Sequence, residues 1–311
     1  MNRTTKDYSL ITLKGIAMGA ADVIPGVSGG TIAFITGIYE ELINSIKSLN
    51  LSALKLLFTG KFAEFWKAVN GTFFLSLMTG IALSIFSLAK GLIYLLDHYP
   101  ILVWSFFFGL VVASAIYVAQ TIKKWNPTII ISGIAGIVIA YYITVITPVE
   151  ANTTYWFIFI SGAIAICAMI LPGISGSFIL VLLGMYKFIL EAVGNFEIAV
   201  IITFLAGAAI GIISFSHVLS WLLNKHHNLT IALLSGFMVG SLNKVWPWKE
   251  VVETFTDRHG EIKPLIEENI LPATYEQLTG NQAFLGGAIA LAAFGFALIF
   301  VIENIANRLK K

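Results

Sequence analysis

Two short segments of this sequence share an unusual combination of proline, glycine and hydroxyl residues. The first reads PGVSGGT over residues 25–31, and the second reads PGISGS over residues 172–177. Proline removes a backbone donor and ends a helix, whereas glycine allows backbone torsions that a Cβ would forbid. A helix that restarts after such a break presents unpaired N–H groups and the positive end of its dipole, which favour an anion. The residue types therefore suggest a site for phosphate or a similar anion.

The expected ligands of that anion are backbone N–H groups and hydroxyls at the two breaks. We assign the breaks to Pro25 and Pro172. The residues expected to bind the anion are Gly26, Ser28, Gly29, Gly30 and Thr31 in the first segment, and Gly173, Ser175, Gly176 and Ser177 in the second. A single break of this kind is more often a helix kink than a binding site. Its duplication with the serines retained favours one site built from both segments.

The elements that carry these breaks belong to a chain with the composition of a membrane protein. Of its 311 residues, 58% are hydrophobic and only 12% are charged, against about 25% charged residues in a soluble domain. A transmembrane helix takes about 20 apolar residues. Six segments meet this requirement: 71–96, 100–122, 128–148, 198–223, 228–247 and 282–303.

The remaining composition narrows the expected partners. The net charge is +2 and no long basic run occurs, so we expect no nucleic acid. A single cysteine, Cys167, provides neither an internal disulfide nor a metal cluster, and we expect no metal and no cofactor. Residues 51–68 alternate lysines with Leu, Phe and Trp, which predicts an amphipathic helix on the membrane surface. Residues 249–281 form a long polar stretch, predicted to be a loop or small cap outside the membrane.

The two breaks lie in an internal repeat. With an offset of 147 positions, residues 15–46 align with residues 162–193, and nine positions are identical. The identities include the P-G-x-S-G and G-x-Y patterns, and three predicted spans follow each copy. The sequence therefore predicts an all-α polytopic membrane protein with two halves, residues 1–150 and 151–311. Each half consists of a broken hairpin, at 10–48 or 155–194, and three transmembrane helices.

The number of crossings predicts the relative orientation of the halves. If each broken hairpin is re-entrant, each half crosses the membrane three times and the second half is inverted. A cytoplasmic N-terminus then places thirteen basic residues inside and six outside or toward that side, which agrees with the positive-inside rule. We therefore expect an inverted repeat with both termini cytoplasmic and residues 249–281 external. This architecture is typical of secondary transporters. If each break instead lay within a full span, the repeats would be parallel.

Several charged or titratable residues are candidates for coupling transport to an ion. Asp22 lies three residues before Pro25, and an acid in the membrane is costly and therefore a functional candidate. We predict that it is protonated or binds a cation when the anion is bound; the alternative is that it caps a helix or pairs with a lysine. The full set of proton-handling or coupling candidates is Asp22, Glu40, Glu41, Glu191 and His217. For His217 the alternative is a hydrogen bond between helices.

Residues on the expected external side have simpler predicted roles. Lys187 and Lys244 are expected to attract the phosphate as it arrives. Trp246 and Trp248 are typical of aromatic anchors at the membrane interface.

The sequence resembles the bacterial polyprenyl-phosphate transporter family in three segments. These are ADVIPGVSGGTIAFITGIYEEL at 21–42, PGISGSFILVLLGMY at 172–186 and SLNKVWPW at 241–248, and the resemblance covers roughly residues 10–305. It implies a transporter and not an enzyme. The expected activity is movement of undecaprenyl phosphate from the outer to the inner leaflet of the bacterial plasma membrane, coupled to a proton or sodium gradient. This activity recycles the lipid carrier of peptidoglycan and other envelope polymers. Lys187, where relatives often carry an acid, and His217, where many carry arginine, depart from the family pattern.

Other functions stay open on the sequence alone. A small-anion transporter or channel would use similar paired half-helices. An intramembrane serine protease would combine GVSG or GISG with His217, although a protease needs one nucleophile and not a symmetric pair. A scramblase without ion coupling is also compatible with the sequence, as is a homodimer.

Overall fold

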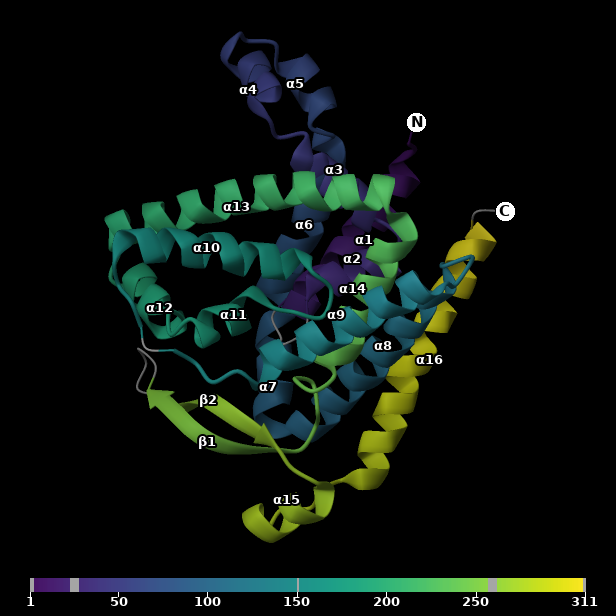
Figure 1. Cartoon of the computed structure of the whole chain (residues 1–311), viewed down its shortest axis with the longest axis vertical. Helices are drawn as coiled ribbons and strands as arrows, with labels where there is room; N and C mark the ends of the chain where they lie inside the picture. Colours follow the sequence, from purple (N-terminus) through teal and green to yellow (C-terminus); the bar gives the residue numbers. More distant parts are fainter. Residues whose placement is uncertain (1–2, 23–27, 150, 257–261, 310–311) are drawn as a thin grey trace.

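The architecture is described here from a computed structural model of the chain, which describes residues 3–22, 28–149, 151–256 and 262–309 (Figure 1). Within these ranges the chain is mostly helical, as predicted. The first half begins with α1 (Thr5–Asp22), α2 (Gly29–Ile35) and α3 (Tyr39–Lys47). It continues with α4 (Leu51–Phe58), α5 (Phe62–Ala68), α6 (Gly71–Ser87), α7 (Ala89–His98), α8 (Pro100–Gln120) and α9 (Pro127–Val145).

The second half repeats the opening arrangement and adds a small β hairpin. Its first three helices are α10 (Tyr155–Ile170), α11 (Gly176–Leu182) and α12 (Tyr186–Gly194). The longer α13 (Ile198–Lys225) and α14 (His227–Ser241) follow. Strands β1 (Lys249–Thr256) and β2 (Ile262–Asn269), then α15 (Pro272–Thr279) and α16 (Leu285–Leu309), complete the chain.

Fewer helices can cross a membrane unaided than the sequence predicted. By length and composition, α8, α9 and α13 each qualify. Two bent pairs qualify only when each pair is taken together, α5 with α6 at a bend of 70° and α11 with α12 at a bend of 110°. Over the described residues, in which α16 is searched only as far as Val301, three to five crossings are therefore supported, instead of six continuous spans. The predicted span 71–96 was wrong as one helix because it is divided at Leu88, and α14 has only 15 residues.

The predicted surface helix at 51–68 was also wrong as a single element. It forms α4 and α5, because Gly60 adopts a left-handed conformation with φ of +75° and ends the first helix. Leu51, Phe58 and Phe62 are exposed on these helices. Figure 1 shows α4 and α5 projecting from the helical body at the end where α1 begins. Their exposed apolar side chains suit the surface of a membrane.

Close helix packing recurs in the two halves. In the first half α1 packs along α6, and in the second half α10 packs along α13. A Cβ at Gly80 would collide with the carbonyl of Thr12, and one at Gly207 with that of Phe159. Thr12 and Phe159 are 147 positions apart, which is the offset of the sequence repeat. Small residues let membrane helices approach this closely.

A second set of helix pairs joins the two halves. Helix α8 packs along α16, while α9 packs along α14. Gly109 on α8 lies against the carbonyl of Ala292 on α16, and Gly236 on α14 lies against that of Gly133 on α9. Each half therefore supplies one helix to each pair. Gly109 and Gly236 make the same kind of contact, in which a glycine lies against a backbone carbonyl of the partner helix.

The described residues of the polar stretch, 249–256 and 262–281, form a β hairpin followed by a short helix. Strands β1 and β2 are antiparallel, with Lys249 opposite Asn269 and Thr256 opposite Ile262. Beside them, Trp248 is buried and donates from Nε1 to the carbonyl of Ala283 at 3.0 Å. The prediction of Trp248 as an interface anchor was wrong, because the ring packs in a small core at this end of the molecule. Figure 1 places β1, β2 and α15 at the end opposite the start of α1.

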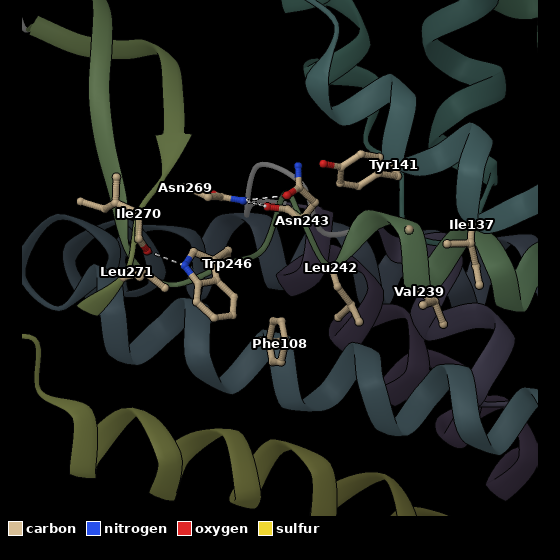
Figure 2. Close-up of a pocket in the computed structure, with 11 residues that line it drawn as sticks. Phe108, Ile137, Tyr141, Val239, Leu242, Asn243, Trp246, Asn269, Ile270 and Leu271 are labelled. Atoms are coloured by element: carbon tan, nitrogen blue, oxygen red, sulfur yellow. Dashed lines mark hydrogen bonds between the residues drawn. The ribbon is translucent and has the colours of Figure 1, made fainter. Parts of the chain in front are cut away.

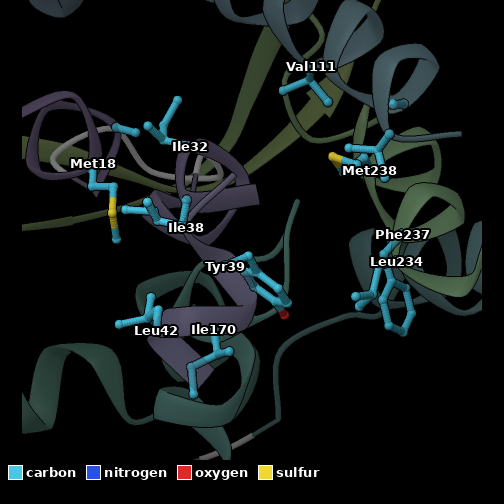
Figure 3. Packing of buried hydrophobic residues seen from close by; sticks show 14 of the residues in the cluster. Met18, Ile32, Ile38, Tyr39, Leu42, Val111, Ile170, Leu234, Phe237 and Met238 are labelled. Atoms are coloured by element: carbon cyan, nitrogen blue, oxygen red, sulfur yellow. The ribbon is translucent and has the colours of Figure 1, made fainter. Parts of the chain in front are cut away.

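The main hydrophobic core surrounds the first broken segment. Figure 3 shows the ring of Tyr39 pointing toward Leu234 and Phe237, with Ile170 nearby, while Ile32 lies on the side of Met18. These residues come from both halves of the chain. The core therefore holds the two broken segments next to each other.

Candidate functional site

The described residues of the first motif copy make hydrogen bonds to groups of both halves. Ser28 caps α2, and its Oγ accepts from the backbone N–H of Gly30 at 3.0 Å. The same hydroxyl donates to the carbonyl of Met169 at 2.9 Å, and Ser28 is completely buried. The N–H of Gly29 donates to Oδ1 of Asp22 at 2.6 Å. The predicted residues Pro25 and Gly26 lie outside the described residues.

The second motif copy has the same cap with different neighbours. Ser175 caps α11 by accepting from the N–H of Phe178 at 3.3 Å, and its Oγ lies 3.3 Å from that of Ser177. Pro172 follows the end of α10. Gly173 has φ of +92°, and a Cβ there would lie 2.5 Å from Oγ of Ser241 on α14. Glycine is required at this position by both its torsion and its surroundings.

The structure brings the two copies into direct contact. The N–H of Gly173 donates to the hydroxyl oxygen of Thr31 at 2.9 Å. The bond from Ser28 to Met169 crosses the same boundary, and Gly30 packs against the carbonyl of Ile170. Residues about 140 positions apart in the sequence therefore share one polar cluster in a hydrophobic core. Gly176 lies at the start of α11, with the carbonyl of Ala165 close by.

Asp22 occupies the position in which an anion was expected. Its carboxylate accepts from Gly29 N–H, and a Cβ on Gly29 would come within 2.5 Å of Oδ2. The alternative interpretation of Asp22, a helix cap, is therefore what the geometry shows. A carboxylate and a phosphate bind such an N–H group for the same electrostatic reason. The two anions would compete for this site.

The other acidic candidates lie away from this cluster, each with its own partner. Glu41 accepts from both terminal nitrogens of Arg3, at 2.5 and 2.6 Å, and from Asn70. Glu40 lies 3.0 Å from Nε2 of His227. Glu191 pairs with Lys187 one turn away on α12 at 3.8 Å, and both side chains are exposed.

The hydrogen bond of His217 lies within its own helix, and not between helices as the alternative interpretation expected. Its Nδ1 lies 2.8 Å from the carbonyl of Ile213 on its own helix, and the side chain is exposed. The serine protease interpretation would require this imidazole beside a motif serine. Instead, the hydroxyl of Ser28 is bonded to backbone groups of Gly30 and Met169.

A charged cluster that the sequence analysis mostly missed lies beside the second motif copy. Oε2 of Glu267 is 3.7 Å from Nζ of Lys244 and 3.3 Å from Nζ of Lys249. Lys244 Nζ also stands 4.8 Å from the ring centroid of Phe178, the third residue of α11. Of these three charged residues, only Lys244 was predicted from the sequence to attract the phosphate. The sequence holds no signal for the other two, because the cluster depends on how the β hairpin folds back.

Lys249 is the most enclosed member of this cluster. Its side chain is 7% exposed, and Nζ lies 4.0 Å from the ring centroid of Trp104 on α8. Burial lowers the pKa of Lys249 to about 8, although the neighbouring carboxylate of Glu267 acts in the opposite direction. A buried ammonium group is costly unless it is paired.

A cavity of about 430 Å³ lies near this charged cluster. Two of its lining residues, Asn243 and Asn269, lie one and two positions from Lys244 and Glu267 in the sequence. Figure 2 shows that the cavity is walled by Phe108, Tyr141 and Trp246, with the amides of Asn243 and Asn269 on one side. Asn269 donates to the backbone and side-chain oxygens of Asn243, and Trp246 donates to the carbonyl of Ile270. The remaining lining residues are Ile137, Val239, Gly240, Leu242, Ile270 and Leu271. The walls are therefore mainly apolar, and the amides of Asn243 and Asn269 and the indole N–H of Trp246 each donate a hydrogen bond within the protein.

Comparisons with known proteins agree with one another. A family model described as undecaprenyl phosphate translocase-like matches residues 18–263. A polyprenyl-phosphate transporter of Vibrio cholerae is 46% identical over 304 residues, which are 98% of this chain and 99% of that protein. A polyprenyl-phosphate transporter of Staphylococcus aureus is 34% identical over 255 residues, covering 76% of this chain and 85% of that protein. No solved structure matches the chain.

Proposed function

Because the chain belongs to the undecaprenyl phosphate translocase-like family, we propose that it transports a polyprenyl phosphate across the bacterial plasma membrane. The observation that carries the proposal is the identity of 46% over nearly the full length of a protein named as a polyprenyl-phosphate transporter. Both relatives are named as transporters, in agreement with the prediction that this chain is not an enzyme. The proposed substrate is undecaprenyl phosphate, moved from the outer to the inner leaflet to recycle the carrier of peptidoglycan and other envelope polymers.

The proposed topology is an inverted repeat of two re-entrant hairpins, each followed by three membrane helices. Corresponding glycine contacts in the two halves support it, as does the exchange of partners in which α8 packs on α16 and α14 on α9. Both termini would be cytoplasmic and the β hairpin external. The positions of α4, α5 and the start of α1 at the end opposite β1 and β2 are consistent with this orientation (Figure 1).

The proposed phosphate site is the place where the two motif copies meet. Its ligands would be the N–H groups and hydroxyls of the residues predicted from the sequence, which are Gly26, Ser28, Gly29, Gly30, Thr31, Gly173, Ser175, Gly176 and Ser177. A charged headgroup in the membrane needs such donors, because every unsatisfied polar group there costs several kcal/mol. To bind, the phosphate would replace the bonds that Asp22 and Thr31 now make to Gly29 and Gly173.

The same exchange offers a route to ion coupling. A proton or sodium ion on Asp22 would weaken its hold on Gly29 N–H and leave that donor to the phosphate. Glu40, Glu41, Glu191 and His217 are weaker candidates, because the structure pairs them elsewhere. In the proposed mechanism, a proton or sodium gradient drives transport through Asp22.

A thermal shift experiment tests the proposed substrate. Purified full-length protein is heated with undecaprenyl phosphate, with phosphate-free undecaprenol or with neither. A ligand that binds only the folded state raises its apparent stability, by about 2.7 kcal/mol when present at 100 times its dissociation constant. We expect undecaprenyl phosphate to raise the melting temperature and undecaprenol to leave it nearly unchanged. Equal shifts with both lipids would contradict recognition of the phosphate.

A further inference from the structure

We propose that Lys244, Lys249 and Glu267 form an external docking site for the lipid phosphate, in which the Glu267 carboxylate is exchanged for the phosphate group. This inference rests on the proposed function and adds a second site to it. The cluster lies beside the second motif copy, so the phosphate would bind here before it reaches that motif. The chemical group recognised is a phosphate monoester with a hydrocarbon tail.

The cluster has an excess positive charge that an additional anion would neutralise. One carboxylate oxygen of Glu267 serves two ammonium groups, at 3.3 and 3.7 Å, so the three side chains carry a net positive charge. A phosphate monoester carries a charge of about −1.5 to −2 near neutral pH and has three acceptor oxygens. It would neutralise both lysines, whereas Glu267 neutralises only one.

The burial of the cluster strengthens this preference. Lys249 is 7% exposed, Lys244 19% and Glu267 22%. Away from water, charge pairs interact more strongly and an excess charge costs more than at the surface. The aromatic rings of Trp104 and Phe178 stabilise the two ammonium groups by cation–π contact. A structural ion pair would need only one lysine, and the second lysine is the feature that points to a ligand.

The surroundings connect this site to both parts of the lipid. Phe178, below Lys244, donates its N–H to Ser175 of the second motif copy, so the cluster borders the proposed transport site. Asn243 and Asn269 are neighbours of Lys244 and Glu267 in the sequence, and both line the apolar cavity shown in Figure 2. Its aliphatic and aromatic walls suit the isoprene units nearest the phosphate.

Equilibrium binding to purified full-length protein in lipid nanodiscs tests the inference. The titrants are undecaprenyl phosphate, undecaprenol and inorganic phosphate, and the signal is tryptophan fluorescence. Lys249→Met is expected to weaken binding of undecaprenyl phosphate by at least about tenfold, the effect of losing one buried charged partner. Glu267→Gln, which keeps the side-chain shape and removes the competing charge, is expected to strengthen it.

Two further variants control for folding and for general loss of charge. The double variant Lys249→Met/Glu267→Gln removes both the buried ammonium group and the competing carboxylate, and it should bind more tightly than Lys249→Met and more weakly than Glu267→Gln. Lys61→Gln removes a lysine from an exposed pair with Glu64 on α5 and should leave the affinity unchanged. Melting temperatures of all variants show whether each is folded.

The outcomes separate this inference from the proposed function. If wild type prefers undecaprenyl phosphate to undecaprenol but Lys249→Met and Glu267→Gln bind it with unchanged affinity, the docking site is wrong and the function stands. If wild type does not distinguish the two lipids, the proposed function itself fails. If inorganic phosphate binds as tightly as the lipid, the site takes free phosphate and the role of the cavity is wrong.

Discussion

The two motif copies share a backbone design but differ in the polar groups that surround them. In the first copy, Asp22 supplies a carboxylate to the start of α2. The position equivalent to Asp22 in the second copy is Met169, whose side chain offers no charge and whose carbonyl accepts from Ser28. The second copy instead has a lysine nearby, since Lys244 stands over Phe178.

This difference suggests that the two halves have different roles in transport. The first copy carries the acid that is proposed to couple transport to an ion, and the second copy borders the positive cluster that is proposed to receive the phosphate. A duplicated fold can therefore hold two unequal chemistries. The reason is that packing depends on small residues at repeated positions, whereas charge depends on single side chains that diverge independently.

The largest loss of transport is expected when a bulky side chain is placed at the start of α2 or α11. Gly29→Leu would push into the Asp22 carboxylate, and Gly176→Leu into the carbonyl of Ala165, 2.7 Å from a Cβ. We expect each variant to reduce transport of undecaprenyl phosphate into proteoliposomes to background, while the protein still inserts into the membrane. Gly286→Leu, where a Cβ meets open space, is the matched control. Normal transport by either motif variant would show that the two copies do not form one site.

Asp22→Asn tests the chemical asymmetry directly. The amide oxygen can still accept from Gly29, so the fold should survive, but the group can no longer gain or lose a proton. We expect transport to fall by about 100-fold or more, since a positioned proton-transfer group contributes at least roughly that factor, and its pH dependence to disappear. Asp97→Asn, at an exposed acid, should change neither. Full activity of Asp22→Asn with an unchanged pH profile would remove Asp22 from the coupling mechanism.

Serine substitutions compare the two caps. Ser28 caps α2 and also bonds to Met169 in the other half, and Ser175 caps α11. We expect Ser28→Ala to lower the free energy of unfolding by about 2 kcal/mol, for the loss of the cap and of the bond to Met169, and Ser175→Ala to lower it by at least about 1 kcal/mol for the loss of the cap. Melting in detergent measures both. An unchanged melting temperature for Ser28→Ala would contradict the assignment of Ser28 as a link between the halves.

The smallest effects are expected at the third helix of each hairpin. On α3, Glu41 binds Arg3 and Asn70, which are distant in sequence. On α12, Glu191 pairs with Lys187 one turn away at an exposed position, and such pairs contribute about 0.3–0.5 kcal/mol. Glu41→Gln should lower the melting temperature measurably, and Glu191→Gln should leave it within error. Equal shifts would mean that α3 is not anchored more firmly than α12.

Local patterns in the sequence predicted several features correctly. The second P-G-x-S-G segment follows the end of α10, α1 ends at Asp22 before the first, and Ser28 and Ser175 cap the helices that follow. Gly37 and Gly184, from the two G-x-Y patterns, both adopt left-handed torsions, with φ of +71° and +65°. These predictions succeeded because breaks and caps depend on a few neighbouring residues.

Other features of the fold could not be predicted from local sequence patterns. The break of 71–96 at Leu88 carries no proline or glycine, and the division of 51–68 depends on one glycine torsion. The pairing of β1 with β2 and the burial of Trp248 were not predicted; Trp248 is buried because it packs with Ile101 of α8 and with Ala283 before α16. Hydropathy also overestimated the helices, since it measures composition and not where a helix ends.

The amino-acid sequence by itself determined the all-helical class, the internal repeat, the two broken segments and the family. These properties follow from composition, spacing and similarity, which need no coordinates. Only the tertiary structure decided that Asp22 occupies the N–H of Gly29, that Thr31 and Gly173 bond across the halves, and that Lys249 and Glu267 join Lys244. Such contacts join residues distant in sequence, and their geometry depends on how all the helices pack together.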